Sequence, residues 1–438
     1  MPVAPEPPAA GRLLVFARFP RPGQAKTRLI PALGPDGAAA LQRRMTEHLL
    51  GSWRALLATG IALEVRHDGA SDRAMRRWLG PGFRYAAQGE GDLGARLKRA
   101  FAEAFQRGAP RVVAAGTDCP ALDATRLRVA FAALAKADVV LGPAADGGYY
   151  LIGSNRFCPA LFDDIPWGTD EVLAATLERI RQNSLTVHLL PELPDVDRPE
   201  DLRHWEAVRA RATRLAVVIP ALNEEEALPA TLEAVRRGEP EELIVVDGGS
   251  RDGTAAVARA HGARVVPSPP GRARQLNAGA AAASAPRLLF LHADTLPPAD
   301  WRKVVDRELA RPDLAAGAFT FGVREPIPRQ RLVEGLVRAR CRWFGTPYGD
   351  QGLFLRRELF DAAGGFPEWP ILEDVGILRR LRRLGRVIVT PETALTSGRR
   401  WRQRGVWRTM AINARVLVGW RLGVPLERLA RWYRGGPR

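Results

Sequence analysis

Cysteine, acidic residues near the C-terminus and long apolar runs are scarce in this sequence. Three cysteines (Cys119, Cys158 and Cys341) are spread over 438 residues without a CxxC pair, which excludes a disulfide framework and a thiolate zinc site. No stretch approaches 18 uninterrupted apolar residues, and the best candidate, 410–424, carries two arginines, so no membrane span is expected. The N-terminus has no charged segment before its first apolar run, LLVFA, and this run is too short for the core of a signal peptide. A cytoplasmic protein is therefore expected.

The C-terminal end is strongly basic. Residues 399–438 hold eleven arginines and a single acid, Glu427, and so carry a net +10 of the whole chain's formal +17. Such an end indicates a phosphate-rich partner: nucleic acid, an anionic membrane surface or a phosphorylated substrate. Arginine together with abundant alanine, glycine and proline is also typical of a GC-rich genome, so part of this charge has no functional meaning.

Short β-rich apolar runs alternate with longer helical patterns along the chain, which predicts an α/β layered fold. The length suits two domains or three. The first half should contain strands at 13–17, 62–66, 112–115, 139–141 and 149–152, and helices at 36–58 and 93–107. The second half should contain strands at 215–219, 243–246, 264–266 and 288–291, and helices at 225–237 and 271–283.

The two halves are laid out alike. Each opens with a strand ending in proline (RLLVFARFP and RLAVVIP), and each later has an apolar strand entering an acidic loop with proline (VVAAGTDCP and LLFLHADTLPP). Two copies of one fold, or a coincidence between two α/β domains, both explain this. We expect a disordered N-terminus at 1–10, a first domain at 11–208, a linker at 209–213, a second domain at 214–398 and a basic helical tail at 399–438.

In the second half, polar side chains follow predicted strands. Asn223 and Glu224 come after one strand, and Asp247 ends the next. Ligands bind outside the carboxyl ends of parallel strands, and carboxylates there can accept hydrogen bonds from a base or a ribose. An Asp-Gly turn in which Ser250 or Asp252 caps the next helix is the alternative.

Two further acidic elements follow. Asp294 comes directly after a buried strand, and one or two carboxylates with phosphate oxygens are what Mg²⁺ typically takes. Glu373 and Asp374 precede an arginine-rich helix, where a carboxylate could deprotonate an acceptor hydroxyl. Alternatively, this acidic pair only offsets the dipole at a helix start.

The order of PALNEEE, VVDGGSRDGT, GRARQLNAGA, LHADT, GDQGLFLRRELFDAAGGF and LEDV resembles glycosyltransferase family 2, over residues 214–436. The tail SGRRW…GWRLGVPLERLARWY is similar to a bacterial subfamily associated with arsenosugar-type gene clusters. The resemblance implies a GT-A fold, an inverting transfer from a nucleotide-diphospho sugar, and a divalent metal (Mg²⁺ or Mn²⁺). It implies Asp374 as the base with Glu373 beside it, and Asp294 as the metal ligand. The usual Asp-x-Asp is His292-Ala293-Asp294 here. The implied nucleotide-sugar-binding residues are Pro220, Asn223, Glu224, Asp247, Asp252, Arg274, Gln351 and Arg400.

The first half has a basic Gly/Pro loop, Phe19–Leu29, after its first strand, and acidic elements around Asp118 and at Asp195–Leu202. Such loops can surround phosphates, although solvated loops and a helix cap explain the same residues. With GPAADGGYYLIG and IPWGTDEVL, these motifs resemble the nucleotidyltransferase-like GT-A family that accompanies the glycosyltransferase above. The resemblance implies that Lys26 and Arg28 hold phosphates and that Asp118 and Asp197 hold a metal. The full glycine-rich signature of sugar-nucleotide synthetases is absent.

The expected function is a metal-assisted glycosyltransferase that acts on an acceptor hydroxyl of a small molecule or a lipid. A bifunctional protein, whose first domain is a sugar nucleotidyltransferase making the donor, is the alternative. Nucleic acid is not an expected partner, because the acidic strand ends would repel a phosphate backbone. An anionic membrane surface, at the inner face of the cell membrane, is a candidate partner of the tail, because Arg400, Arg404, Arg408 and Arg415 would share one face of a single helix. Packing of that helix on the catalytic domain is the alternative.

Overall fold

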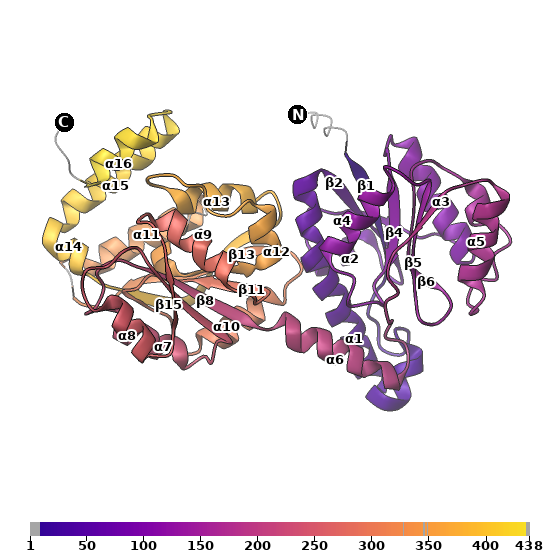
Figure 1. Cartoon of the computed structure of the whole chain (residues 1–438), viewed down its shortest axis with the longest axis horizontal. Helices are drawn as coiled ribbons and strands as arrows, with labels where there is room; N and C mark the ends of the chain where they lie inside the picture. Colours follow the sequence, from indigo (N-terminus) through magenta and orange to yellow (C-terminus); the bar gives the residue numbers. More distant parts are fainter. Residues whose placement is uncertain (1–8, 327, 345–346, 348, 435–438) are drawn as a thin grey trace. The chain divides into compact units, whose positions relative to one another are not determined.

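The computed structural model describes residues 9–326, 328–344, 347 and 349–434, and the chain forms two compact units. The first comprises Met1–Ala210 with Ala310–Asp313, and the second Arg211–Leu309 with Leu314–Arg438. In each unit helices flank one central sheet (Figure 1). The predicted linker at 209–213 falls mostly within helix α6 (Leu202–Ala212). The predicted disordered segment 1–10 lies mostly outside the described residues.

The first unit is built on a seven-stranded sheet in the order β3-β2-β1-β4-β6-β5-β7. Strand β6 is antiparallel to β4 and β5, and the other neighbours are parallel. Fully buried aliphatic side chains of β1 and β4 form the centre of the core. The strands are β1 (Gly11–Arg18), β2 (Ile61–Asp68), β3 (Arg84–Ala87), β4 (Val112–Gly116), β5 (Val139–Pro143), β6 (Tyr149–Ser154) and β7 (Val187–Leu189).

The helices of this unit connect the strands and cover the sheet. Ser71, Asp92 and Asp123 cap three of them by accepting a hydrogen bond from a backbone N–H of the first turn, as such residues do at helix starts. Besides α6, the helices are α1 (Ile30–Trp53), α2 (Asp72–Leu79), α3 (Leu93–Gln106), α4 (Ala124–Ala133) and α5 (Val172–Gln182).

The second unit is built on an eight-stranded sheet in the order β10-β9-β8-β11-β14-β13-β15-β12. Its core runs from the apolar residues of β8 to Trp301 and Phe354, which are fully buried. The strands are β8 (Leu215–Ala221), β9 (Glu242–Asp247), β10 (Arg264–Pro267), β11 (Arg287–Phe290), β12 (Thr295–Leu296), β13 (Leu314–Val323), β14 (Leu353–Arg356) and β15 (Arg386–Thr396).

The two sheets have the same topology. When the two-residue strand β12 is set aside, the strands of each sheet follow the order 3-2-1-4-6-5-7 by their place in the chain. The sense of every pair is also shared: the sixth strand is antiparallel to both neighbours, and the rest are parallel. Of the two interpretations of the similar halves, the structure therefore supports two copies of one fold. The expected fold class, two mostly parallel α/β sheets in tandem with a helical tail, is confirmed.

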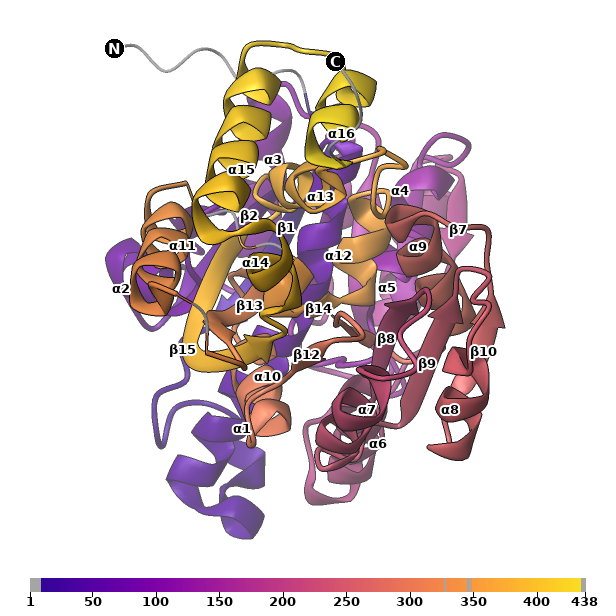
Figure 2. The same cartoon turned by 90° about the vertical axis from the view of Figure 1, so that its left-hand side faces the viewer.

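The second unit ends in the helical tail. Its last helices, α15 and α16, lie side by side (Figure 2). None of the described helices is long and apolar enough to cross a membrane. The helices are α7 (Leu228–Arg236), α8 (Thr254–Ala260), α9 (Arg272–Ala282), α10 (Trp301–Leu309), α11 (Gln330–Phe344), α12 (Arg357–Ala362), α13 (Glu373–Leu381), α14 (Arg399–Arg404), α15 (Val406–Arg421) and α16 (Leu426–Arg434).

The prediction that four tail arginines share one helix is wrong. Gly405 adopts φ 77° and ψ 149°, a conformation that favours glycine, and it separates α14 from α15. Arg400 and Arg404 therefore lie in one helix, and Arg408 and Arg415 in the next.

Two of these arginines contact the last helix. Arg404 donates a hydrogen bond to the carbonyl oxygen of Tyr433 over 2.8 Å. The guanidinium of Arg415 lies 4.1 Å from the centroid of the Trp432 ring, a cation–π distance. Arg404 and Arg415 thus contact another helix of the tail, an arrangement that neither of the two interpretations of the basic stripe included.

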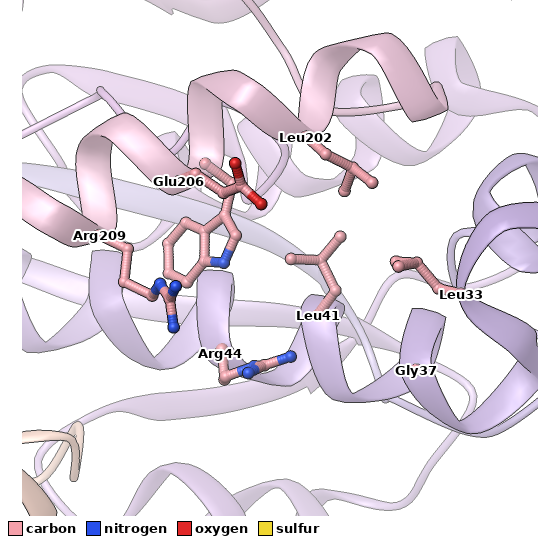
Figure 3. Close-up of a pocket in the computed structure, with 8 residues that line it drawn as sticks. Leu33, Gly37, Leu41, Arg44, Leu202, Glu206 and Arg209 are labelled. Atoms are coloured by element: carbon pink, nitrogen blue, oxygen red, sulfur yellow. The ribbon is translucent and has the colours of Figure 1, made fainter.

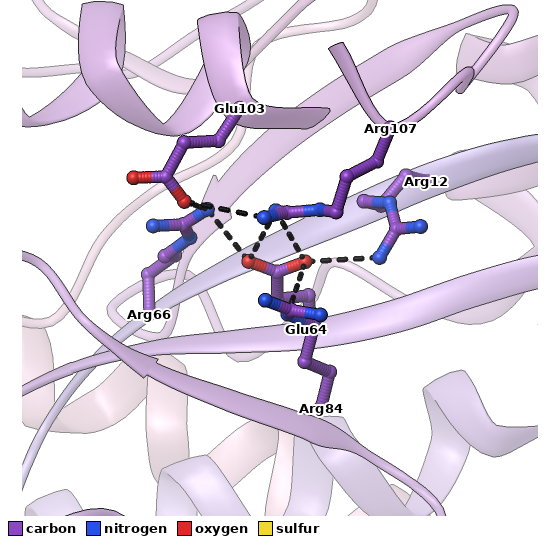
Figure 4. Close-up of polar contacts among 6 residues, drawn as sticks. All are labelled: Arg12, Glu64, Arg66, Arg84, Glu103 and Arg107. Carbon is purple, nitrogen blue, oxygen red and sulfur yellow. Dashed lines mark hydrogen bonds and ion pairs between the residues drawn. The ribbon is translucent and has the colours of Figure 1, made fainter. Parts of the chain in front are cut away.

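A buried carboxylate in the first unit is surrounded by arginines (Figure 4). Glu64 of β2 has a fully buried side chain and forms ion pairs with Arg66 at 2.7 Å and Arg12 at 2.9 Å. Arg107 and Arg84 approach it from α3's C-terminal end and from β3, at 3.2 and 3.6 Å. Because a buried charge without partners is very costly, the buried Glu64 carboxylate depends on these arginines.

Candidate active site

The carboxyl ends of β8, β9 and β11 lie next to each other because these strands are parallel neighbours. Asp247 is the last residue of β9 and pairs with Ala221, the last residue of β8. Asp294 follows β11 at the same edge. The structure thus brings together two of the carboxylates predicted from the sequence, at the place where ligands bind in such sheets.

Hydrogen bonds join the two loops that follow β8 and β9. Asn223, in the left-handed region at φ 55°, accepts a hydrogen bond from the Arg251 N–H over 2.9 Å, and its own N–H donates to Ser250 Oγ. Asp252 accepts hydrogen bonds from the backbone of Thr254 and Glu225. Asn223 and Asp252 therefore shape the loops, whereas Gly253 is the N-cap of the helix that follows and no side chain caps it.

Glu224 is held by an arginine of the tail. Arg399 Nη2 donates to both carboxylate oxygens of Glu224 at 3.0 Å. Burial raises the pKa of Glu224 and of Asp294, and the positive charge of Arg399 opposes this shift for both carboxyls. Arg399 thus lies within electrostatic reach of two acids at the sheet edge.

Asp374 occupies the first turn of α13 and is buried. Its Oδ2 accepts a hydrogen bond from the Gly349 N–H over 2.9 Å. Burial, with the neighbouring Glu373 charge, raises the pKa of Asp374 to about 7. A carboxyl with that pKa is a suitable general base near neutral pH. Leu372, at φ 65°, sets the entry to the helix, and a strained backbone of this kind is common at functional sites.

His292 lies beside Asp374. A Cβ built on Gly349 would lie 2.6 Å from His292 Nε2 and 3.2 Å from Asp374 Oδ2, so both side chains border one point. The His292 Nε2 atom is buried and has no hydrogen-bond partner in the described part of the chain. Burial, helped by Arg272, holds the pKa of His292 well below its usual value. The ring is therefore neutral at pH 7.

Arg272 connects the base region to the metal-ligand candidate. Its Nη1 lies 3.5 Å from Glu373 Oε1, and its charge acts on Asp374 and Asp294 as well. Glu373 is buried and faces this arginine. Arg272 and Arg399 thus both place a positive charge near the acidic side chains of this edge.

Other predicted residues have different surroundings. Gln351 is 1% exposed, donates to the Phe319 carbonyl and accepts from Cys341 Sγ, which fits a role in holding the loop around Gly349 rather than contact with a sugar donor. Arg274 is exposed and pairs with Glu368 at 3.1 Å. Pro220 lies within β8. Arg400 lies in α14, and its side chain is outside the described part.

Sequence reasoning missed Arg272 and Arg399. Arginine is so frequent in this chain that its occurrence alone gives no signal, and Arg399 is adjacent to the Arg400 that was predicted. Only the ion pairs with Glu373 and Glu224 distinguish these two arginines from the others.

In the first unit, the predicted residues meet around a lysine. Lys26 Nζ lies 2.5 Å from Asp118 Oδ1, 3.3 Å from Asp197 Oδ1 and 2.6 Å from the Val196 carbonyl oxygen. Arg28 donates to the other oxygen of Asp197 over 2.8 Å. The structure thus brings all four predicted side chains together.

Asp68 of the first unit was not predicted. It is the last residue of β2 and pairs with Arg18, the last residue of β1, as Asp247 pairs with Ala221 in the second unit. The shared topology reveals this equivalence, which residue patterns alone did not. The Asp68 carboxylate accepts a hydrogen bond from Arg18 over 3.1 Å.

A small cavity lies elsewhere in the first unit, between α1 and α6 (Figure 3). Its volume is about 190 Å³, below the roughly 300–1,000 Å³ of pockets that enclose drug-sized ligands. It is too small to enclose a nucleotide sugar. The lining residues are Leu33, Gly37, Leu41, Arg44, Leu202, Trp205, Glu206 and Arg209.

No group of three or more His, Cys, Asp or Glu side chains that could hold a metal ion occurs within residues 9–326, 328–344, 347 and 349–434. A divalent metal at Asp294 would have to take most of its ligands from a bound diphosphate and from water. That fits Mg²⁺, which commonly binds through one or two carboxylates plus substrate phosphates.

Comparison with known proteins identifies two families along the chain. Residues 216–366 match the family model described as glycosyl transferase family 2, and residues 53–169 match a family described as uncharacterized proteins conserved in bacteria. The predicted resemblance to family 2 is thus confirmed, and a second family model covers part of the first half.

Curated relatives match only part of the chain. An uncharacterized glycosyltransferase of Mycobacterium bovis is 42% identical over 115 residues, which is 26% of this chain and 50% of the relative. Glucosyl-3-phosphoglycerate synthase of Mycobacterium tuberculosis is 37% identical over 105 residues, 21% of this chain and 32% of the relative. The chain therefore spans about half the length, or less, of the curated relatives it matches.

A solved structure of that synthase, in complex with Mn²⁺, uridine diphosphate and glucosyl-3-phosphoglycerate, is 22% identical to this chain with a TM-score of 0.37. The match covers 51% of this chain and 85% of the synthase.

Proposed function

Because the second half of the chain carries a glycosyl transferase family 2 domain, we propose that the protein transfers a sugar from a nucleotide-diphospho sugar to an acceptor hydroxyl. The observation that carries this proposal is the buried Asp374 carboxyl, which accepts the Gly349 N–H and borders His292 at the start of α13. It belongs to the same site as Asp294, since Arg272 acts on both.

The donor would lie along the carboxyl edge of the second sheet. Asp247, half-buried at the end of β9, would accept hydrogen bonds from the nucleoside. Arg272 and Arg399 would face the diphosphate, because they are the cations found beside Asp294. A divalent metal held by Asp294, Mg²⁺ or Mn²⁺, would neutralise the negative charge that develops on the leaving diphosphate.

Asp374 would act as the general base. The acceptor oxygen forms a bond to the anomeric carbon, the bond from that carbon to the diphosphate oxygen breaks, and the acceptor proton moves to Asp374. Because a single displacement attacks the face opposite the leaving group, the anomeric configuration inverts. The neutral His292, whose Nε2 borders Asp374, would position the acceptor hydroxyl or a neighbouring sugar hydroxyl.

The acceptor is proposed as a small molecule, with a lipid as the second candidate. The name of the curated relative, glucosyl-3-phosphoglycerate synthase, suggests a phosphorylated small acceptor. The tail leaves Trp407, Val418 and Leu422 exposed beside its arginines, which is compatible with peripheral contact to anionic lipid at the inner membrane face. Co-sedimentation that needs anionic vesicles and weakens with salt would select the lipid. A cytoplasmic location suits either acceptor.

The first unit is proposed to bind a small anion through the exposed side of Arg28, and not a nucleoside triphosphate. The alternative, in which this unit makes the nucleotide sugar that the second unit consumes, predicts release of pyrophosphate.

A thermal-shift panel of nucleotide sugars and nucleoside diphosphates, with and without Mn²⁺ or Mg²⁺, tests the proposed function. A true donor stabilises the folded protein by about 2.7 kcal/mol at a hundredfold excess over its dissociation constant. Asp247→Asn is the variant to compare, because it should lose the selectivity for one nucleoside over another. If no nucleotide sugar shifts the unfolding of the second unit, the proposal is wrong.

A further inference from the structure

The predicted metal site of the first unit is already filled by a side chain. Lys26 Nζ is surrounded by two carboxylate oxygens and one carbonyl oxygen, from Asp118, Asp197 and Val196. Carboxylate and carbonyl oxygens are the ligands that hard divalent cations take in proteins. An ammonium group therefore stands where the two acids would hold a metal.

Three oxygens surround this ammonium, two of them through hydrogen bonds and one through an ion pair. A lysine ammonium has three N–H donors and no acceptor, and three acceptors lie at 2.5, 2.6 and 3.3 Å from Lys26 Nζ. The Lys26 side chain is only 4% exposed. In this arrangement it has no N–H left for a phosphate, so the two roles expected of these residues, phosphate binding by Lys26 and metal binding by Asp118 and Asp197, exclude each other.

The backbone holds the lysine in this position. Lys26 has φ 49° and ψ 48°, a left-handed conformation that is unfavourable for a residue with a Cβ. The 3₁₀ turn Thr27–Leu29 follows directly.

The second unit has a different arrangement of charges at the equivalent place. Its loop after β8, ALNEEE, has no lysine, and Asp294 is approached by Arg399 and Arg272 instead. Two copies of one fold thus differ at the cation position: one copy contains an internal ammonium, and the other leaves a carboxylate at the edge for a donor and its metal.

We propose that Lys26 is the resident cation of the first unit, and that Asp118 and Asp197 bind no divalent metal while it is present. The proposal concerns the first unit alone and does not depend on the transferase function of the second.

Mn²⁺ alone is the probe, and the full-length Asp294→Ala chain is the background, so that the second unit contributes no site. Calorimetry and the electron paramagnetic resonance of bound Mn²⁺ should show no site that depends on Asp118 in this background. Lys26→Met should create one site per chain, at least tenfold tighter than any binding before the change. Adding Asp118→Asn to Lys26→Met should remove that site.

Arg28→Met is the matched control, because Arg28 pairs with Asp197 but does not bridge the two acids. It should create no Mn²⁺ site. Lys26→Met breaks a buried ion pair, so its fold is checked by circular dichroism. The background chain provides a second test with Lys26 intact: Asp118→Asn there should leave Mn²⁺ uptake unchanged. Loss of uptake in that variant, or no gain in a folded Lys26→Met chain, would overturn the proposal.

Discussion

Gly349 donates its backbone N–H to Oδ2 of Asp374 over 2.9 Å, and the same glycine leaves room for His292. A Cβ at position 349 would lie 2.6 Å from His292 Nε2, closer than carbon and nitrogen can approach without movement. This glycine therefore fixes the distance between the proposed base and the imidazole.

Gly349→Ala should reduce transfer by roughly 10–100-fold, because displacements of about 1 Å in an active site have effects of that size. The folded content should stay unchanged. Gly335→Ala is the control, since nothing lies within 4 Å of a Cβ at that position of α11, and it should transfer at the unmodified rate. Equal activity of both variants would show that the spacing is unimportant.

Asp374→Asn should reduce transfer by roughly 10²–10⁴-fold, the usual contribution of a general base, and leave donor binding largely intact. With Asp374, the rate should rise with pH and level off above about pH 7, because the base must be deprotonated and its pKa is about 7. Rate profiles from pH 5 to 9 with saturating donor provide the measurement. Near-normal turnover of the variant would show that another residue acts as the general base, and Glu373 would be the first to test.

The same carboxyl predicts a pH dependence of stability. Its pKa of about 7 in the folded state is higher than the roughly 3.9 of an aspartate in an unfolded chain. Between these two values the folded state binds more protons, so stability falls as pH rises. Asp374→Asn should therefore unfold at a higher temperature than the unmodified chain above pH 7. The difference should disappear as pH falls towards 4. Thermal unfolding of both proteins across this range is the check.

Much of the fold was predictable because strands and helices leave periodic patterns. Every strand expected from the sequence is present, and so are the expected helices, such as α3 and α9. The missed strands β3 and β7 are short, and β7 is exposed along its whole length, so neither has the buried apolar run that marks a strand. The long strands β13 and β15 were also missed, although β13 is almost wholly buried.

The site was predictable in its parts but not in its contacts. Asp247, Asp294 and Asp374 stand out because an acidic residue after an apolar strand or before a helix is conspicuous. Three features depend on residues that are distant in the sequence. They are the left-handed backbone of Lys26, the helix break at Gly405 and the pairing of Arg399 with Glu224. One-dimensional patterns do not contain that information.

Asp294→Ala should abolish the metal-dependent part of nucleotide-sugar binding. Mn²⁺ without a nucleotide should stabilise the second unit little, because no described cluster of three ligand side chains is available to it. Mn²⁺ together with a nucleoside diphosphate should stabilise it clearly. Calorimetric titrations of the unmodified chain, Asp294→Ala and the exposed-surface control Glu233→Ala test this order of binding. Tight Mn²⁺ binding at Asp294 without nucleotide would contradict it.

Glu64→Gln should destabilise the first unit by about 3–5 kcal/mol, the usual effect of removing one partner from a buried ion pair. Arg66, which is 2% exposed, would then retain only Glu103 as a charged partner. Denaturant unfolding followed by circular dichroism measures the loss. Glu178→Gln, which removes an exposed pair with Arg181, should leave the midpoint unchanged. Similar midpoints for both variants would show that the arginine cluster is dispensable.

The division of labour between the units is tested by Asp118→Asn in the full chain. Asparagine keeps an oxygen that can accept a hydrogen bond from Lys26, so the buried ammonium stays partnered. If the first unit makes no donor, this variant should transfer sugar from a supplied nucleotide sugar at the unmodified rate. The unmodified chain should also release no pyrophosphate when given a nucleoside triphosphate and a sugar phosphate.

We expect the first unit to make no donor because of the charge distribution at the edge of its sheet. Lys26 and Arg28 are both engaged by Asp118 and Asp197, and burial together with the Asp146 charge raises the pKa of the nearby Asp195. A triphosphate approaching this edge would meet carboxylates with little uncompensated positive charge. Pyrophosphate release by a chain carrying Asp374→Asn, lost again when Asp118→Asn is added, would establish the bifunctional alternative and show that the ligand rearranges this ion cluster.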